Sequence, residues 1–349
     1  MSISLADRLI GLDHPPLVIA EMSGNHNQSL DRAIAIVDAA AAAGAHALKL
    51  QTYTADTITL DVRGGTFEVN DTDSLWSGKN LHDLYKQAYT PWEWHEPIMR
   101  RAKDHGMLCF SSPFDESAVD FLEDLDVPAY KIASFENNHL PLIKKAAETG
   151  KPLIISTGMA SLGELEQSVT TAREAGCTDL ILLKCTSTYP ATPQNTNIRT
   201  IPHLRKLFNC EVGLSDHTMG VGVAIASVAL GSTVIEKHFT LSRADGGVDS
   251  AFSLEPNELE NLVAETSRAW LSLGEVKYGP TKSEKKSLVF RRSIYVAQDI
   301  KAGEPFTAKN LRIVRPGYGA PPSMYNLLIG KIAKKSFRKG DPLALESLL

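Results

Sequence analysis

The sequence predicts an α/β protein: a (β/α)8 TIM barrel over residues 1–280, a linker over 281–290 and a small β-rich domain over 291–349. Eight β-rich runs alternate with helical segments as far as about residue 275, which fits the size of a parallel (β/α)8 barrel. Beyond residue 280 the helical period fades, and short runs with Gly and Pro turns follow. The polar stretch TKSEKKSL, Thr281–Leu288, separates the two parts.

The predicted strands are short apolar runs bounded by turn residues. They are Leu17–Glu21, His46–Thr52, Met107–Ser112, Ala129–Ser134, Leu153–Thr157, Leu180–Thr186, Glu211–Asp216 and Thr233–Phe239. Helical periodicity follows these runs, for example at Asp31–Ala43, Ser117–Leu125, Leu162–Ala175, Val221–Leu230 and Pro256–Leu273. A doubly wound open sheet is the competing fold. The residues at the end of the first strand, EMSGNHN, lack the GxGxxG pattern of that fold, which favours the barrel.

One connection of the predicted barrel is unusually long. Between the second strand and Thr90, the stretch Ala55–Lys79 is polar and irregular and contains RGG, NDTD and WSGK. An insertion of this length after a barrel strand is typical of a lid or a substrate-facing loop. A disordered excursion is the alternative, but Trp76 and Tyr85 favour partial order.

The C-terminal segment contains an internal repeat. AQDIKAGEPFTAKNL, Ala297–Leu311, matches KKSFRKGDPLALESL, Lys334–Leu348. The aligned positions are Ile300 with Phe337, Gly303 with Gly340, Pro305 with Pro342 and Leu311 with Leu348. A repeat this short predicts one compact domain with pseudo-twofold symmetry.

Composition excludes several classes of protein. The chain has 349 residues, of which 43% are hydrophobic and 22% charged, and its formal net charge is −5. This mild acidity provides no general attraction for nucleic acid or for an anionic membrane surface. The apolar runs are too short to span a membrane, and MSISLADRLI does not resemble a signal peptide. The cysteines show no paired spacing, so we expect reduced thiols in a cytoplasmic protein at Cys109, Cys177, Cys185 and Cys210.

Polar and ionisable residues gather at or soon after the ends of the predicted strands. Because active-site groups of a (β/α)8 barrel lie at the carboxyl ends of its strands, these side chains should meet at one mouth. They are Glu21, Lys49, Gln51, Ser112, Lys131, Ser134, Glu136, Ser156, Ser187, Tyr189, Ser215, Glu236 and Asp249. This many polar groups in one place predict a site for a small, polar, anionic ligand.

Two histidines indicate a metal site. His217 and His238 close the seventh and eighth strands, which are neighbours in a barrel, so their imidazoles should meet above it. Two His ligands, completed by water and substrate oxygens, suit a divalent transition metal that acts as a Lewis acid on a carbonyl. We expect no cysteine ligand near them, which favours a more weakly held ion than structural zinc.

Two lysines lie on predicted strands, where a buried ammonium group is costly unless it is paired. Lys49 and Lys131, together with serine hydroxyls, could neutralise and hydrogen-bond a phosphate and a carboxylate. A Schiff-base lysine is the rival chemical interpretation, with Lys131 as the candidate. A structural ion pair, for instance between Lys49 and Glu236, is the other, and the residues alone leave both open.

A series of sequence blocks at these positions resembles the sialic acid synthase family over essentially the whole chain. In order they are IAEMSGNHN (Ile19–Asn27), LKLQTY (Leu48–Tyr53), FSSPFD (Phe110–Asp115), YKIASFE (Tyr130–Glu136), ISTGM (Ile155–Met159), CTSTYP (Cys185–Pro190), GLSDHT (Gly213–Thr218) and EKHFT (Glu236–Thr240). The tail resembles the antifreeze-like (SAF) domain of that family at RRSIYV (Arg291–Val296) and RPGYG (Arg315–Gly319). A free-standing antifreeze-like binding module is a further interpretation, but the charged pair Lys334–Lys335 favours a lid over an ice-binding face.

Within the family, three segments resemble the branch that makes pseudaminic acid: YTPWEWHE (Tyr89–Glu96), SFENN (Ser134–Asn138) and RADGGVDSAFSLEP (Arg243–Pro256). The likeness implies condensation of phosphoenolpyruvate with an open-chain 2,4-diacetamido-2,4,6-trideoxy hexose of the altrose type. The products are a nine-carbon 2-keto sugar acid and phosphate. N-acetylneuraminate or legionaminate synthesis, the same chemistry on another acceptor, is the alternative.

The resemblance also implies roles for individual residues. His217 and His238 would bind a divalent metal, Mn²⁺ first, with Mg²⁺ or Co²⁺ as alternatives. The phosphoenolpyruvate site would consist of Lys49, Lys131, Ser134, Ser156, Ser187 and Ser215, with Gln51 and Ser112 in the same pocket. Glu21 and Glu136 would handle protons, and Tyr189 and the catalytic Asp249 would contact the sugar. Arg315 would come from the C-terminal domain of the partner subunit in a homodimer.

Overall fold

The computed structural model describes residues 2–72 and 75–344. The chain divides into two compact units, Met1–Gly274 and Glu275–Leu349. Among the described residues, we find no helix with the length and apolar character needed to cross a bilayer.

The first unit contains the predicted barrel. In the part of the chain that the structure describes, eight parallel strands close in the order β10-β3-β4-β5-β6-β7-β8-β9. Their bounds are β3 Leu17–Glu21, β4 Ala47–Thr52, β5 Leu108–Pro113, β6 Tyr130–Ile132, β7 Leu153–Ser156, β8 Leu180–Cys185, β9 Glu211–Ser215 and β10 Val234–His238. Closure is direct, because β10 pairs with β3 in the register His238 to Glu21. The (β/α)8 fold predicted from the sequence is therefore confirmed.

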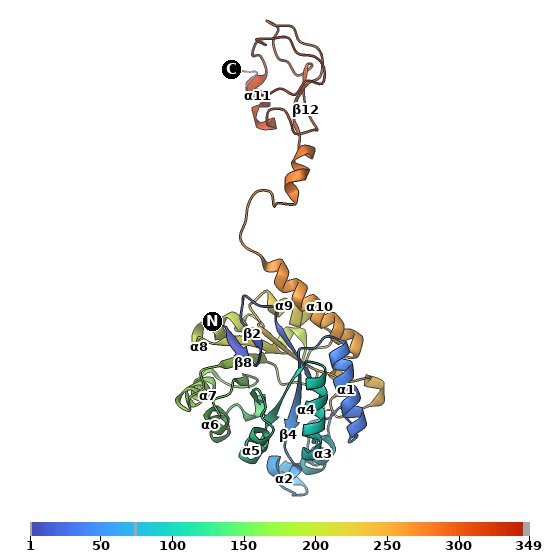
Figure 1. Cartoon of the computed structure of the whole chain (residues 1–349), viewed down its shortest axis with the longest axis vertical. Coiled ribbons are helices and arrows are strands. Elements are labelled where there is room, and N and C mark those ends of the chain that lie inside the picture. Colours follow the sequence, from blue (N-terminus) through green and yellow to red (C-terminus); the bar gives the residue numbers. More distant parts are fainter. Residues whose placement is uncertain (1, 73–74, 345–349) are drawn as a thin grey trace. The chain divides into compact units, whose positions relative to one another are not determined.

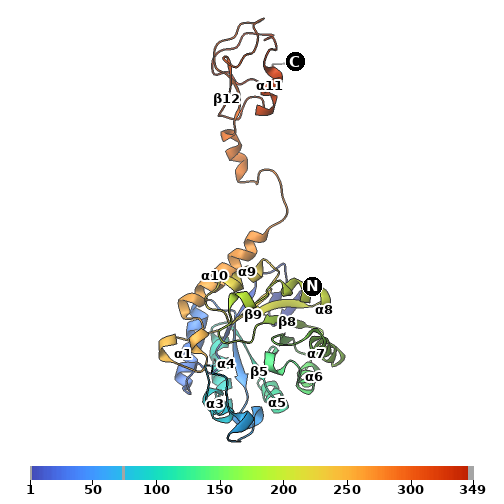
Figure 2. The same cartoon turned by 180° about the vertical axis from the view of Figure 1, so that it is seen from behind.

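The helices of this unit lie outside the ring of strands, as Figures 1 and 2 show from opposite sides. Their bounds are α1 Leu30–Ala42, α2 Ala55–Ile58, α3 Leu81–Ala88, α4 His95–Asp104, α5 Glu116–Asp124, α6 Leu140–Glu148, α7 Leu162–Glu174, α8 Thr200–Phe208, α9 Gly222–Val228 and α10 Pro256–Leu273. Local chemistry fixes several helix starts. In α7, Ser161 and Glu164 form a capping box, in which each side chain accepts from the other residue's backbone N–H.

An N-terminal hairpin is the element that the sequence did not predict. Its strands, β1 Ile3–Leu5 and β2 Arg8–Ile10, pair antiparallel, and Leu5 and Ile10 are buried in the core of the barrel unit. Strands of three residues are too short to show an alternating pattern, which explains the omission.

The long connection after β4 is partly ordered in its described residues. It contains α2, a short 3-10 helix at Gly65–Phe67 and a bridge between Glu68 and Asn80. Asn80 also caps α3 through its side chain. The expected partial order is confirmed, whereas movement of this segment as a lid stays a prediction.

The C-terminal unit has its own small hydrophobic core. Its elements are β11 Ser293–Val296 and β12 Leu311–Val314, which pair antiparallel, α11 Tyr325–Leu328, and 3-10 helices at Glu284–Phe290 and Pro322–Met324. The two copies of the sequence repeat bind each other reciprocally. Ile300 N–H donates to Phe337 O (2.9 Å) and Phe337 N–H donates to Ile300 O (2.8 Å).

The same exchange recurs one step along the repeat. Gly303 N–H donates to Ala333 O and the equivalent Gly340 N–H donates to Val296 O, both at 2.8 Å. Both glycines have positive φ, +88° and +96°, so each copy makes the same turn. This is the pseudo-twofold relation that the repeat predicts. The aligned Leu348 lies outside the described residues.

Candidate active site

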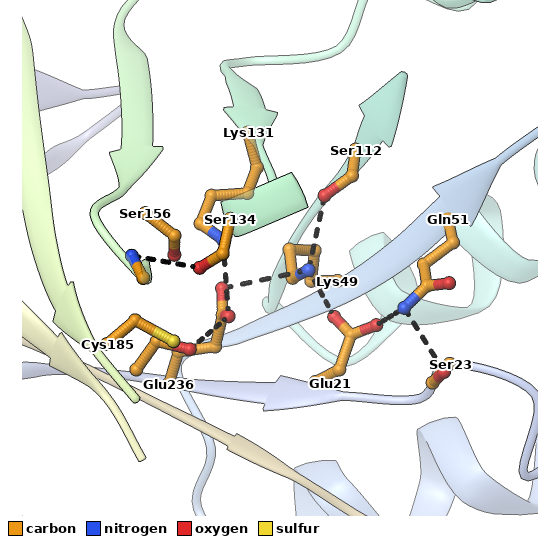
Figure 3. Close-up of polar contacts among 12 residues, drawn as sticks. Glu21, Ser23, Lys49, Gln51, Ser112, Lys131, Ser134, Ser156, Cys185 and Glu236 are labelled. Atoms are coloured by element: carbon orange, nitrogen blue, oxygen red, sulfur yellow. Dashed lines mark hydrogen bonds and ion pairs between the residues drawn. The ribbon is translucent and has the colours of Figure 1, made fainter. Parts of the chain in front are cut away.

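The polar strand ends predicted from the sequence converge at the carboxyl mouth of the barrel, and Figure 3 shows the central group. Lys49 on β4 is at the centre and is only 3% exposed. Its Nζ lies 2.7 Å from Glu21 Oε2 on β3 and 3.2 Å from Ser112 Oγ on β5. A more distant carboxylate, Glu236 Oε2 on β10, lies 3.8 Å away. The ion pair that the sequence offered as an alternative role for Lys49 is therefore present, but its nearer partner is Glu21.

Lys131 on β6 is the second buried ammonium group, 2% exposed. Among the described residues, its polar contact is with Glu236 Oε1 at 3.4 Å. An ammonium group has three N–H donors, so a single long contact leaves Lys131 with unused hydrogen-bonding capacity in a buried place. Such a group is favourable only if a ligand supplies further acceptors.

Three serines and one glycine border Lys131. Gly158 N–H donates to Ser134 Oγ (3.2 Å), and Ser156 Oγ is buried without a hydrogen-bond partner among the described residues. A Cβ placed on Gly158 would lie 2.1 Å from Ser187 Oγ and 2.6 Å from Ser134 Oγ, so only glycine fits between these hydroxyls. Hydroxyls, a backbone N–H and a buried cation in one place are the groups that hold phosphate.

The two carboxylates at the lysines differ in their ionisation. Burial raises the pKa of Glu21 although Lys49 opposes the rise. Burial alone would also raise the pKa of Glu236. Lys131, Lys49 and the Ser215 hydroxyl outweigh burial and hold the pKa of Glu236 well below its usual range. Ser215 Oγ donates to Glu236 Oε1 at 3.0 Å. Glu236 is therefore the firmly ionised carboxylate beside the two lysines, whereas burial lowers the pKa of Lys131 against the opposing effect of Glu236. An anionic ligand would favour the charged form of both lysines.

The imidazoles of His217 and His238 lie edge to face, with ring centroids 5.3 Å apart. His217 Nδ1 lies 2.9 Å from Thr186 O, so in the neutral ring the proton is on Nδ1 and Nε2 has the lone pair that a cation could use. Burial tends to lower the pKa of His217, but Cys185 and Thr186 O outweigh burial and raise it. Burial lowers the pKa of His238 well below its usual value, which keeps that ring neutral. His238 Nδ1 is buried without a hydrogen-bond partner among the described residues.

These features fit a divalent cation held by two imidazoles. No three His, Cys, Asp or Glu side chains converge as a complete metal site within the described ranges. Asp249 Oδ2 is the nearest carboxylate oxygen, 3.6 Å from His238 Nδ1. The remaining ligands of such an ion would therefore have to come from water or from a substrate.

Cys185, at the end of β8, lies beside the histidines, although the unpaired spacing of the cysteines does not indicate which thiol faces the mouth. Its Sγ lies 3.9 Å from His217 Nδ1 and 3.8 Å from Ser187 Oγ. Burial raises the pKa of this thiol, but His217, Ser134 and Lys131 outweigh it and bring the pKa to about 6. The contact is to the His217 nitrogen that lies beside Thr186 O, so the expectation that no cysteine binds the cation stays a prediction. All four cysteines are free, as predicted.

An aromatic wall lines the side of the imidazole pair. The ring of Tyr189 lies 4.5 Å from that of His217 and 5.2 Å from that of Phe252, which is 4.9 Å from His238. Trp76, from the long insertion, extends this wall at 5.8 Å from Tyr189. Its indole Nε1 donates to Val248 O at 3.1 Å, so the insertion touches the loop after β10.

A polar chain connects the anion pocket to that loop. Gln51 Nε2 donates to Glu21 Oε1 (2.9 Å) and to Ser23 Oγ (3.1 Å), and Ser23 Oγ donates to Asp249 Oδ2. Glu136, in the 3-10 helix Ser134–Glu136 after β6, has a buried Oε2 without a hydrogen-bond partner among the described residues. Burial raises its pKa to about 7, although Lys131 opposes the rise.

One predicted residue, Arg315, belongs to the C-terminal unit. Arg315 is exposed in the C-terminal unit, so its contribution to a partner's site stays a prediction. Sequence reasoning also missed residues that the geometry makes important. Gly158 was visible within ISTGM but carried no chemical signal, and Asn137, which donates to Gly158 O (2.9 Å), was visible only as part of SFENN.

The barrel mouth thus combines a buried anion pocket with a pair of imidazoles suited to a divalent cation, which defines a barrel enzyme acting on a small anionic substrate. Comparison with known families shows to which family of barrel enzymes the chain belongs. The model of the NeuB family matches residues 36–278, and that of the SAF domain matches residues 291–349. This chain belongs to the NeuB family.

Individual relatives agree with this assignment. The chain is 43% identical to a pseudaminic acid synthase of Campylobacter jejuni, covering 95% of this chain and 96% of that protein. An N,N'-diacetyllegionaminic acid synthase of the same species is 35% identical, covering 93% and 98%. A crystal structure of N-acetylneuraminic acid synthetase from Leptospira borgpetersenii, in complex with citrate, superposes with a TM-score of 0.72 and 31% identity over 82% of this chain and 95% of that one.

Replacing Gly158 with alanine tests the anion pocket. Because the new Cβ would collide with the Ser134 and Ser187 hydroxyls, we expect the Kd for inorganic phosphate to rise by about tenfold or more. Isothermal titration calorimetry measures it. Gly163→Ala in α7 is the control, since a Cβ there meets no atom within 4 Å. Unchanged phosphate affinity in Gly158→Ala would contradict the pocket.

Replacing Glu136 with glutamine tests its raised pKa. The usual value of 4.5 applies to the unfolded chain and about 7 to the folded one, so the native state loses stability as pH rises between them. Glutamine mimics the neutral acid. Relative to wild type, we expect no stability difference near pH 4.5 and a gain of about 1–3 kcal/mol at pH 8.

Denaturant unfolding at several pH values measures this difference in the free energy of unfolding. The exposed Glu260→Gln in α10 is the control and should give a difference that does not vary with pH. A flat profile for Glu136→Gln would show that burial does not perturb this carboxyl.

Proposed function

We propose that this chain is a pseudaminic acid synthase. It condenses phosphoenolpyruvate with an open-chain 2,4-diacetamido-2,4,6-trideoxy hexose of the altrose type, giving a nine-carbon 2-keto sugar acid and phosphate. The observation that carries the proposal is the pair of buried lysines, Lys49 and Lys131, at the same barrel mouth as two adjacent imidazoles. The 43% identity to a pseudaminic acid synthase supports this acceptor over the one used by the less similar legionaminic acid synthase.

The anion pocket suits phosphoenolpyruvate because that substrate carries two acidic groups. Within the described part of the chain, Lys131 has unused N–H donors and the Ser156 hydroxyl has no partner. These groups, with the Ser134 and Ser187 hydroxyls around Gly158, could hydrogen-bond phosphate oxygens. Lys49, with Ser112 and Gln51, holds the other end of the same ligand, and Ser215 keeps Glu236 ionised beside both lysines. As the bond to phosphate breaks, the ammonium groups stabilise the charge that collects on the leaving group.

His217 and His238 would hold the divalent cation, for which we propose Mn²⁺, with Mg²⁺ or Co²⁺ as alternatives. When bound, such an ion supplies Lewis acidity that makes the sugar aldehyde a better electrophile for C3 of phosphoenolpyruvate. A proton must leave the water that adds at C2. Glu136 and Glu21 are suited to this, because burial moves their pKa values towards neutrality and lets either carboxyl gain or lose a proton near pH 7.

The aromatic wall and the loop after β10 provide the acceptor site. Asp249 is placed beside His238 to orient a sugar hydroxyl, and its carboxylate is itself fixed by Ser23. Beyond Tyr189, Trp76 borders a hollow of about 490 Å³, whose lining combines Leu75, Val248 and Ala251 with polar side chains, namely Asn27, Gln28, Lys79 and Gln87. The apolar part of this lining suits the methyl groups of a 6-deoxy, diacetamido sugar, and the polar part suits its amides and hydroxyls.

We further propose a cytoplasmic homodimer in which Arg315 of one subunit closes the sugar site of the other. The barrel would extend over residues 1–280 and the SAF domain over 291–349. The support is the match of the SAF model to residues 291–349 and the exposure of Arg315 in its own unit.

Phosphate release tests the proposed function. Purified protein is incubated with phosphoenolpyruvate, Mn²⁺ and one of three acceptors: the altrose-type sugar, the legionaminic acid precursor or N-acetylmannosamine. We expect the highest kcat/KM with the altrose-type sugar. A preference for either other acceptor would move the chain to another branch. Borohydride trapping of a pyruvate adduct on Lys131, without phosphate release, would instead support a Schiff-base aldolase.

Trp76→Ala tests the acceptor wall. We expect KM for the acceptor sugar to rise about tenfold, because an aromatic contact to the sugar is lost, while KM for phosphoenolpyruvate stays the same. Steady-state kinetics with each substrate varied in turn measures both constants. Trp76→Phe retains a ring and is the matched control. An unchanged sugar KM in the alanine variant would remove Trp76 from the acceptor site.

A further inference from the structure

A buried ion pair lies directly behind the two imidazoles. On β10, Glu236 and His238 face the barrel mouth, so Lys237 between them points to the opposite side of the strand. On the adjacent strand and its extension, Asp216 stands between Ser215 and His217 in the same way. Lys237 Nζ meets Asp216 Oδ2 at 2.8 Å, and the two residues are 1% and 2% exposed.

This pair is fully satisfied by hydrogen bonds. Besides Asp216, Lys237 Nζ donates to Thr218 O (2.6 Å) and Gly220 O (2.8 Å), which accounts for all three N–H groups. Asp216 Oδ1 accepts from Thr218 N–H (3.0 Å) and from Thr218 Oγ1–H (2.8 Å). Lys237 of β10 therefore binds the turn 216–220, which carries His217, at three positions.

The backbone alone does not provide this link. The register of β9 with β10 runs only as far as Ser215 opposite Glu236, and the last ladder bond is Asp216 N–H to Glu236 O, 2.9 Å. His217 is otherwise fixed from the β8 side, through Thr186 O and Ala191 N–H, and His238 O accepts from Leu254 N–H (2.8 Å). Tyr189 and Phe252 pack against both imidazoles. Within the described residues, the hydrogen-bonded connection between the two imidazole-bearing segments at this level is made by Lys237, through Asp216, Thr218 O and Gly220 O.

We propose that Asp216 and Lys237 are positioning residues that set the separation of the His217 and His238 imidazoles for a divalent cation. The inference rests on the proposed function in one respect, namely that these two imidazoles bind the cation. It adds that cation affinity depends on a charge pair that touches neither the cation nor the substrates.

The test is Mn²⁺ binding to the full-length protein without substrates, followed by isothermal titration calorimetry and by the Mn²⁺ electron paramagnetic resonance spectrum. Asp216→Asn keeps the shape and one acceptor but removes the charge. We expect its Kd for Mn²⁺ to rise by about tenfold or more, with an altered spectrum, because groups that orient metal ligands typically matter by this much. The Kd for phosphoenolpyruvate in the absence of metal should stay within about threefold of wild type, since Lys49 and Lys131 lie on other strands.

The control is a comparable ion pair at the other end of β9. Glu211 is 3% exposed and its Oε2 lies 2.6 Å from Arg205 Nη1. Glu211→Gln also breaks a buried pair on this strand, but far from the imidazoles, so it should lower the melting temperature and leave the Mn²⁺ Kd unchanged. Equal weakening of Mn²⁺ binding in both variants would reduce the effect to general destabilisation and overturn the inference.

The remaining outcomes separate this inference from the proposed function. If His217→Ala binds Mn²⁺ as well as wild type, or wild type binds none, the proposed cation site fails and the inference fails with it. If His217→Ala loses Mn²⁺ and Asp216→Asn binds it normally, the inference alone fails. If Asp216→Asn does not fold, Thr218→Val is the alternative variant, because it removes the hydroxyl that donates to Asp216 Oδ1. We expect about a fivefold rise in its Kd for Mn²⁺. Wild-type affinity in that variant would then overturn the positioning role.

Discussion

The burial of two lysine ammonium groups at the mouth of the barrel is the constraint on which the site depends. Lys49 and Lys131 are 3% and 2% exposed, and uncompensated charges in such a place would oppose folding strongly. Glu236 contacts both lysines and Glu21 contacts Lys49, so the two carboxylates offset the burial of the two charges. Because burial raises the pKa of Glu21, this compensation is incomplete when Glu21 is protonated, and the proposed anionic substrate would complete it.

The alternation of side chains along a strand lets this barrel separate chemistry from support. In GLSDHT and EKHFT, the residues that face the mouth are Ser215, His217, Glu236 and His238. The residues between them, Asp216 and Lys237, form the buried pair on the other side of the wall. In each motif, therefore, the residues that face the mouth and the residue of the buried pair occupy adjacent positions, because neighbouring side chains of a strand point to opposite sides.

The sequence was sufficient for the fold because strand and helix periods are local properties. All eight barrel strands were predicted with ends at most two residues from those observed, and the convergence of Glu21, Lys49 and Lys131 followed from the rule that strand ends meet. Which lysine pairs with which acid could not be predicted, because it depends on side-chain reach across the mouth. For the same reason the sequence could not predict that Cys185 lies beside His217 or that the hydroxyls pack around Gly158. Neither a lone cysteine nor a glycine belongs to a spacing pattern that indicates its neighbours.

In the proposed site, the anion pocket is centred on Lys49 of β4 and Lys131 of β6, and the cation site on His217 and His238 after β9 and on β10. The proposed acceptor specificity depends on other residues. The surfaces that would read the sugar come from the insertion after β4 and the loop after β10, which meet where Trp76 donates to Val248 O. That loop is fastened to the barrel separately, by Arg32 with Asp245 and by Arg243 with Glu258. Loops tolerate sequence change better than barrel strands, because fewer buried contacts depend on them. A family can therefore keep one condensation reaction with the residues of its strands and change the accepted sugar through two loops. For this reason the strand-end residues are the evidence for the reaction, and the loop residues are the evidence for the branch of the family.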